Sequence, residues 1–164
     1  MEKENCNICQ IPRAYAHCGI CKCALCKSCE HFQEPDKFLF LELVPEELKL
    51  IHYCPDCFDV QIVPAQTKYE ETMERAKKIN IFFILDKNLP RLLKKANNPI
   101  RIQNCKDRDE TILRLGFKAA ELGFNSVIKV DVSATQIRNI THQKSNWSGT
   151  GVPADIDETK YFLV

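Results

Sequence analysis

Four Cys-x-x-Cys pairs stand within the first 57 residues of the chain: Cys6/Cys9, Cys18/Cys21, Cys26/Cys29 and Cys54/Cys57. A two-residue gap lets one tight turn aim both sulfurs at a single ion, and a tetrahedral zinc site takes four thiolates. The eight cysteines therefore predict two structural zinc ions. A four-thiolate zinc has no open position for water, so we expect these ions to stabilise the fold and not to catalyse a reaction.

The spacing of the pairs predicts which of them share an ion. Four residues separate Cys21 from Cys26, so the second and third pairs can hardly fold around the same metal. We therefore expect Cys6/Cys9 with Cys26/Cys29 at one site, and Cys18/Cys21 with Cys54/Cys57 at the other. This cross-brace arrangement would tie the segment from Glu30 to Tyr53 into the module.

Other ligand-type side chains accompany the pairs, namely Cys23, His17, His31 and His52. Nine cysteines and three histidines could fill three tetrahedral sites, but the adjacency of His17 and Cys18 disfavours this. We expect Cys23 to be a small buried side chain and the histidines to hydrogen-bond around the sites. Residues 1–6 lack the apolar stretch of a secretory signal, which favours a reducing cytoplasm, where spaced cysteines act as ligands rather than forming disulfides.

Composition divides the chain into unequal parts, because only Cys105 of the ten cysteines follows residue 57. We predict a zinc-finger domain over 1–64, a linker helix over 65–78 and an α+β domain with a mostly antiparallel sheet over 79–164. The net charge of +1 excludes a global field that would attract nucleic acid, so any binding to an anionic surface must be local. No apolar run approaches the roughly 20 residues that span a bilayer.

The elements that position the pairs are read from hydrophobic periodicity. In the first half we predict a short apolar strand or an inter-domain surface over 38–44. We also predict a helix from Pro45 at its first turn to Ile51, and a helix over 67–78 that begins at a Thr67/Glu70 capping box. In the second half we predict strands over 79–86, 99–105, 126–132 and 147–152, and an antiparallel return over 133–142. A turn or short helix is expected over 88–95, a helix over 107–122 between Asp107 and Gly123, and an apolar end over 161–164.

The stretch from His17 to Cys29 resembles the central part of FYVE-type zinc fingers, and Cys54-Pro55-Asp56-Cys57-Phe58 resembles their closing pair. His17 before the third cysteine and Leu25 before the fifth match that family's pattern. The upstream WxxD element and the basic flank that hold phosphatidylinositol 3-phosphate are absent, which leaves Arg13, His17 and Lys22 as anion contacts. The resemblance thus implies a protein partner first and a phosphoinositide membrane second.

A second resemblance keeps an alternative open. The pairs Cys6/Cys9, Cys26/Cys29 and Cys54/Cys57, taken with Cys21 and Cys23, are similar to a RING finger. That resemblance implies a ubiquitin ligase in which Ile8 and Pro55 help dock a conjugating enzyme. The two interpretations differ in whether Cys18 or Cys23 completes the second site.

The second half resembles YbjQ-type and RcsF-like domains, through Leu122-Gly123-Phe124-Asn125 after a helix and Gly149-Thr150-Gly151-Val152 near the end. YbjQ-type domains form ring oligomers, so this resemblance permits a homo-oligomer without implying one. Its metal-binding label has little support, since the half offers only Cys105 and His142 as soft ligands. We find no catalytic motif, and Ser148-Gly149-Thr150-Gly151 lacks the strand-then-helix context of a phosphate loop. The sequence predicts a zinc-stabilised interaction protein and no enzyme other than the ligase alternative.

Overall fold

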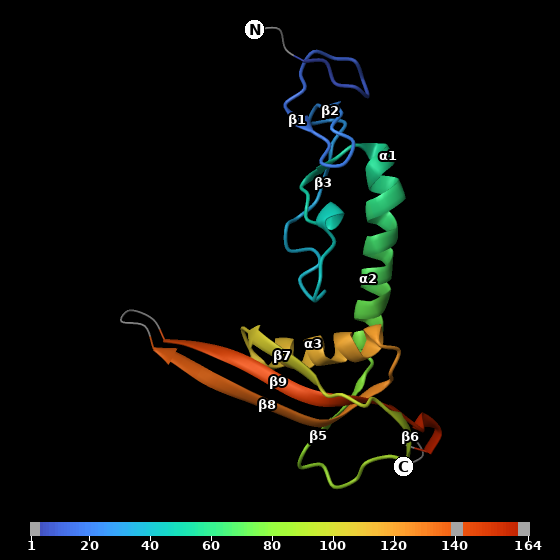
Figure 1. The fold of residues 1–164 in the computed structure, drawn as a ribbon, viewed down its shortest axis with the longest axis vertical. Coiled ribbons are helices and arrows are strands. Elements are labelled where there is room, and N and C mark those ends of the chain that lie inside the picture. Colours follow the sequence, from blue (N-terminus) through green and yellow to red (C-terminus); the bar gives the residue numbers. More distant parts are fainter. Residues whose placement is uncertain (1–3, 139–142, 161–164) are drawn as a thin grey trace. The chain divides into compact units, whose positions relative to one another are not determined.

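The computed structural model describes residues 4–138 and 143–160, and the chain divides into two compact units, Met1–Glu70 and Glu71–Val164 (Figure 1). The division lies within a helix. The predicted domain boundaries, after residue 64 and after residue 78, fall on either side of it. No helix in the described residues is long and apolar enough to cross a membrane.

Unit 1 is built from short elements followed by one continuous helical segment. Its strands are β1 (Ala16–His17), β2 (Ala24–Leu25), β3 (His31–Phe32) and β4 (His52–Tyr53), and its 3-10 helix is η1 (Glu46–Leu48). β1 pairs with β2 and β3 with β4, each antiparallel. The helical segment comprises α1 (Pro55–Cys57), the π-helical turn η2 (Phe58–Ile62) and α2 (Val63–Ala76), of which the last residues belong to unit 2.

The helical segment begins twelve residues before the predicted helix, at the last cysteine pair. Cys54 is the N-cap, Pro55 occupies the first helical position, and the Cys54 sulfur accepts from the Cys57 N–H at 3.4 Å. The closing pair is thus also a helix first turn. The predicted capping box is wrong, because Thr67 lies inside α2, where its hydroxyl donates to the Val63 carbonyl.

The core of unit 1 packs this helix against the segment between β3 and β4. Phe58, Ile62, Ala65 and Tyr69 recur at helical spacing and lie in one cluster with Phe38, Leu48 and Tyr53, among other side chains. The buried Tyr53 hydroxyl donates to the carbonyls of Glu47 and Leu50. The predicted strand over 38–44 is wrong: the segment is a series of turns that aims Phe38 at Tyr69. The helix predicted from Pro45 to Ile51 is shorter than expected: only the 3-10 helix η1 forms there, with Pro45 as its N-cap.

Unit 2 is a sheet covered on one face by a helix, and the predicted α+β class with a mostly antiparallel sheet is confirmed. β8 (Ser126–Arg138) and β9 (Gln143–Ile156) form a long antiparallel hairpin. β5 (Asn80–Phe83) runs parallel to β8, while β6 (Leu92–Lys95) and β7 (Ile100–Cys105) pair antiparallel with different parts of β9. The short 3-10 helix η3 (Glu158–Lys160) follows the sheet.

Helix α3 (Arg108–Glu121) forms where predicted, with the Asp107 carboxylate accepting from the Glu110 N–H at 2.7 Å and Gly123 following at φ +83°. Its buried Leu115 and Ala119 pack on Val127 and Val130 of β8. A second apolar cluster holds Phe82, Ile128, Ala154 and Ile156 and contains no residue of α3.

Two predictions in unit 2 are wrong. Residues 133–138 do not return antiparallel; they continue β8, and the returning strand is β9. Residues 92–95 form β6 and not a helix, because they pair with residues 154–156 of β9. The remainder of that predicted return, residues 139–142, and the predicted apolar end at 161–164 lie outside the described residues.

The glycines of β9 let the hairpin pack closely on its neighbours. A Cβ added at Gly151 would lie 2.5 Å from Val127 Cγ1 and 3.2 Å from Val130 Cγ2, and one at Gly149 would lie 2.7 Å from Thr111 Cγ2 on α3. Such distances are well below van der Waals contact, and Val127 is fully buried with no room to move.

We therefore expect Gly151→Ala to destabilise unit 2 by about 1–3 kcal/mol, the usual cost of overpacking a core. Thermal unfolding followed by circular dichroism measures the effect. Ser133→Ala, at an exposed position of β8, is the control and should leave the midpoint unchanged. Equal midpoints for Gly151→Ala and wild type would contradict the packing described here.

Candidate metal centre

The eight cysteines of the four pairs come together in two groups. Cys6, Cys9, Cys26 and Cys29 form the first group, and Cys18, Cys21, Cys54 and Cys57 form the second; within each, the four sulfurs lie within 4.8 Å of one another. The sulfurs of Cys9 and Cys26 are 3.7 Å apart, as are those of Cys21 and Cys54. A disulfide would need about 2.05 Å. Four sulfurs each about 2.3 Å from a central zinc would be about 3.8 Å apart, so each group could hold a metal ion.

The β1–β2 hairpin explains why the middle pairs separate. Cys18 directly follows β1 and Cys26 directly follows β2, so the two cysteines leave the antiparallel hairpin at opposite ends. The grouping is therefore interleaved, as the spacing of the pairs predicts. Asn7 fixes the first turn to this hairpin, because its side-chain oxygen accepts from the Ala24 N–H while its backbone N–H donates to the Ala24 carbonyl.

Backbone N–H groups point at the sulfurs and favour the thiolate form. Donation from the N–H groups of Cys9 and Ile8 lowers the pKa of Cys6 to about 6, against a smaller opposing effect of burial. Burial opposes the thiolate of Cys18 most, yet donation from the N–H groups of Cys54, Cys21 and Ile20 brings its pKa to about 6. The turns are thus arranged to receive anionic sulfur, the form that a metal requires.

Other thiols of the groups shift in the opposite direction. The neighbouring Cys26 thiol, together with burial, raises the pKa of Cys29 to about 12, and burial raises the pKa of Cys57. Without a cation, sulfurs this close cannot all carry negative charge. A divalent ion at the centre of each group would remove that conflict, and the donor set of four thiolates suits zinc.

Cys23 lies beside the second group without belonging to it. It is partly buried against Cys18, Leu25 and Cys54. Burial, followed by the adjacent Cys21 thiol, raises the pKa of Cys23 to about 12, which keeps it protonated. Of the two cysteines considered for the fourth position, the structure places Cys18 in the group.

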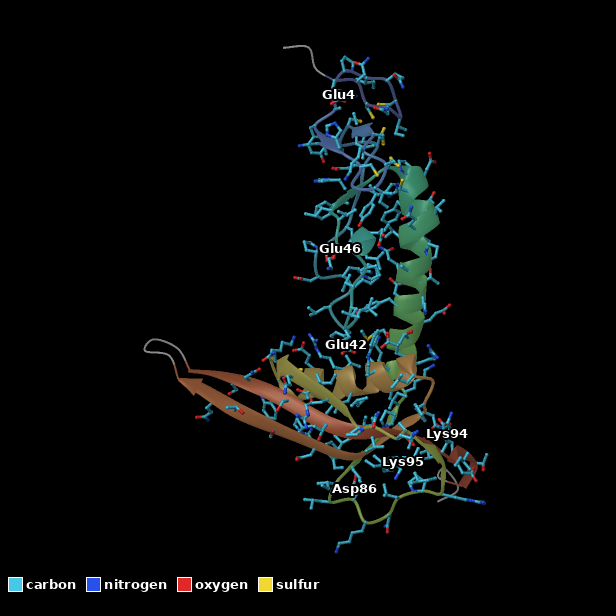
Figure 2. The ribbon with its side chains drawn as sticks, viewed as in Figure 1. Glu4, Glu42, Glu46, Asp86, Lys94 and Lys95 are labelled. Atoms are coloured by element: carbon cyan, nitrogen blue, oxygen red, sulfur yellow. The ribbon has the colours of Figure 1, made fainter. Side chains whose placement is uncertain are left out.

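The three histidines of unit 1 have partners other than the cysteine groups. His17 Nε2 lies 3.2 Å from a Glu4 carboxylate oxygen, and His52 Nδ1 lies 2.7 Å from a Glu30 oxygen (Glu4 is labelled in Figure 2). His31 stacks on Phe58 with ring centroids 4.5 Å apart. These contacts favour two metal sites over three.

Gly19 fits the turn of the second group against the unit 1 core. A Cβ added there would lie 2.6 Å from Leu50 Cδ1 and 2.9 Å from Leu50 Cβ, and the Gly19 N–H donates to the His52 carbonyl. Leu50 packs in the cluster around Tyr53. Any larger residue must displace either the turn or the core.

Gly19→Ala should therefore lower the stability of unit 1 by about 1–3 kcal/mol and accelerate release of metal to a chromogenic chelator. The rate of metal release measures this effect. Ser28→Ala, in the turn between Cys26 and Cys29, is the matched control, because it adds no atom that would approach a neighbouring side chain as a Cβ at Gly19 approaches Leu50. If both variants released metal at the wild-type rate, the close approach of Gly19 to Leu50 would have no energetic role.

Residues from the two family resemblances are accessible. Ile8 is exposed in the turn between Cys6 and Cys9, and Pro55 is partly exposed at the helix start. Arg13 is also exposed, whereas the Lys22 ammonium donates to the Gly19 carbonyl at 2.5 Å. Of the anion contacts named from the sequence, His17 and Lys22 are thus already paired within the turns.

One surface feature of unit 1 has no signal in the sequence. Tyr15 and Phe32, which are 50 % and 61 % exposed, both meet the His52 ring edge-on, at centroid distances of 6.1 and 6.2 Å. Glu30 accepts from the Tyr15 hydroxyl and also faces His52. We call these four residues the aromatic cluster. The pairing of β3 with β4 assembles it, and spacing along the chain does not reveal that pairing.

The residues singled out in unit 2 do not form a site. Cys105 is buried and its thiol lies 3.8 Å from the Gln103 carbonyl oxygen, while His142 lies outside the described residues. Residues 148–151 lie inside β9, which continues to Ile156, so they do not precede the first turn of a helix. Comparisons with known proteins do not extend this description: no protein-family model, curated protein sequence or solved structure matches the chain.

Proposed function

We propose that unit 1 is a FYVE-like, cross-brace module that binds two zinc ions through Cys6/Cys9/Cys26/Cys29 and Cys18/Cys21/Cys54/Cys57, and that its role is to present a rigid surface to a protein partner. The observation that carries the proposal is the sulfur geometry, since sulfurs 3.7 Å apart fit a tetrahedral four-thiolate site. Zinc supplies the fold of the module, because its apolar core is small and its strands have two residues each. Thiolate ligands also fit a reducing compartment such as the cytoplasm.

The aromatic cluster is the surface that fits a protein partner best. A few residues, often aromatic side chains or arginines, supply most of the binding energy at protein interfaces. Here the exposed rings of Tyr15 and Phe32 are held in fixed positions by His52 and Glu30. Lys27, 5.7 Å from the centre of the Tyr15 ring, adds a cation beside it. A preorganised surface of this kind loses little side-chain freedom on binding.

The position of Cys18 favours the interaction module over the ligase alternative. A RING-type site would need Cys23 as the fourth member of the second group, and Cys18 holds that place. An autoubiquitination assay with a panel of conjugating enzymes tests the alternative directly. Product formation that Ile8→Ala abolishes would replace the proposed function with a ligase.

The proposed function is tested by metal analysis and by partner capture on the same preparation. Inductively coupled plasma mass spectrometry should find two zinc ions per chain, one for each group. Photo-crosslinking in cell extract should then give products that Phe32→Ser removes and Leu43→Ser retains, since Leu43 is 87 % exposed and is not a member of the aromatic cluster. Absence of zinc, or identical products from both variants, would overturn the proposal.

A further inference from the structure

The connection between β5 and β6 in unit 2 concentrates exposed aliphatic side chains. Within residues 84–95, which we call the basic-aliphatic segment, five large apolar side chains are exposed: Ile84 (62 %), Leu85 (85 %), Leu89 (42 %), Leu92 (40 %) and Leu93 (62 %). Single exposed leucines are ordinary on protein surfaces, but five large apolar side chains exposed within ten residues are a concentration that indicates an interaction site.

Cations surround these aliphatic side chains. Lys87, Arg91, Lys94 and Lys95 are all exposed, and Asp86 is the segment's one acidic residue. The Asp86 carboxylate accepts from the Phe83 N–H at 2.6 Å, so it serves the turn after β5. Although the whole chain carries a net charge of only +1, this segment is strongly basic on its own.

Backbone contacts fix the two ends of the segment and leave its middle projecting. The Ile84 N–H donates to the Val130 carbonyl, the Arg91 carbonyl accepts from the Asp157 N–H, and the Ala96 N–H donates to the Pro153 carbonyl. Between Ile84 and Arg91 the chain forms an open loop that extends from the sheet on the side away from α3 (Figure 1), and the residues after Arg91 form β6. Asp86, Lys94 and Lys95 are labelled along this part of unit 2 in Figure 2.

We propose that the basic-aliphatic segment docks unit 2 onto an anionic lipid bilayer, with the aliphatic side chains of its loop entering the acyl boundary and its exposed cations facing the lipid phosphates. Charge complementarity selects this occupant. Basic residues near a negatively charged leaflet each strengthen binding about fivefold, and aliphatic groups gain by leaving water for the fluid acyl region. The inference is independent of the metal sites of unit 1.

Other occupants fit these observations less well. A second copy of the segment would bring two sets of four cations together, which disfavours self-association through this surface. A protein interface would use aromatic anchors in a shaped pocket, whereas the large apolar side chains of this segment are all aliphatic and lie on a loop and on the strand β6 that follows it. A fluid bilayer needs no complementary shape.

Co-sedimentation of the full zinc-loaded chain with phosphatidylcholine vesicles, with and without phosphatidylserine, tests the proposal. We expect binding to the phosphatidylserine vesicles alone, and weaker binding as the salt concentration rises. Leu85→Ser should weaken binding about tenfold or more, and Lys87→Gln with Arg91→Gln about thirtyfold. Leu43→Ser matches the first variant at an equally exposed leucine of unit 1, and Lys78→Gln with Lys129→Gln matches the second at exposed positions of unit 2.

Four outcomes would overturn the proposal. These are equal binding to both kinds of vesicle, no binding to either, equal losses in segment and control variants, and binding that Arg13→Gln in unit 1 abolishes while the segment variants retain it. Sedimentation velocity adds a fifth, an oligomer that Leu85→Ser dissociates, which would assign the segment to an interface between copies. Circular dichroism confirms the fold of each variant, and the zinc content separates these outcomes from a failure of the proposed function.

Discussion

Removal of the metal by a strong chelator should unfold unit 1 and leave unit 2 folded. Structural zinc contributes about 10–16 kcal/mol of binding free energy in small zinc modules, and that energy is folding energy when the site does not exist in the unfolded chain. In unit 1, both cysteine groups join turns far apart in the sequence, and its strands have two residues each. Unit 2 has its own sheet and apolar core, which contain neither group.

Hydrogen exchange followed by mass spectrometry measures this effect on the full chain. Peptides from residues 4–60 should lose their protection after chelation, while peptides covering α3, β8 and β9 keep theirs. Return of zinc should restore protection in the first set. Protection of residues 4–60 that persists after complete metal removal would show that the apolar cluster around Tyr53 suffices to hold unit 1.

Leu115→Ala should destabilise unit 2 by about 2–5 kcal/mol without changing the zinc content of the chain. Leu115 is fully buried between α3 and the sheet, where it packs with Ala119, Val127 and Val130. Truncation removes its buried methyl groups and leaves a cavity that the close-packed surroundings fill only in part. A domain of this size has about 5–15 kcal/mol of stability in total, so the loss is a large share of it.

Urea unfolding, monitored by a signal from unit 2, measures how much Leu115→Ala lowers the free energy of unfolding. Leu122→Ala is the matched control, because Leu122 is the C-cap of the same helix and is 52 % exposed. Leu122→Ala should lower the free energy of unfolding of unit 2 by much less than Leu115→Ala does. Similar losses in the two variants would mean that α3 does not pack on the sheet through Leu115.

The grouping of the cysteines could be predicted because it depends on local geometry. A two-residue gap forces each pair to one centre, and the short stretch from Cys21 to Cys26 keeps the middle pairs apart. The choice between Cys18 and Cys23 needed the structure. It depends on the β1–β2 pairing, which directs Cys18 toward Cys54 and leaves Cys23 beside the group.

In unit 2, helix α3 and strand β7 were predicted because their signals are local, an Asp107 cap and a Gly123 end for the one and alternation for the other. β6 was missed because Leu92 to Lys95 has no alternating pattern and is a strand only through its pairing with β9. The length of β8 was also missed, since the residues from Ser133 onward were assigned to a strand that returns antiparallel, and only the pairing with β9 shows that they continue β8.

In unit 1, the early start of the helix was missed because Pro55 and Cys57 were assigned to a metal-binding turn. Both assignments hold, since a turn with Cys54 as N-cap can continue into a helix. The segment from Phe38 to Val44 was mistaken for a strand because its apolar side chains form a continuous run. Its backbone has no strand to pair with, and Phe38 instead packs against Tyr69 of α2.

Zinc quantification on two single variants tests the central claim most directly. The wild-type chain and Cys23→Ser should each hold two zinc ions, whereas purified Cys18→Ser, which loses a member of the second group, should hold one tightly bound zinc ion. Two zinc ions in Cys18→Ser together with one in Cys23→Ser would contradict the assignment and place Cys23 in the second site.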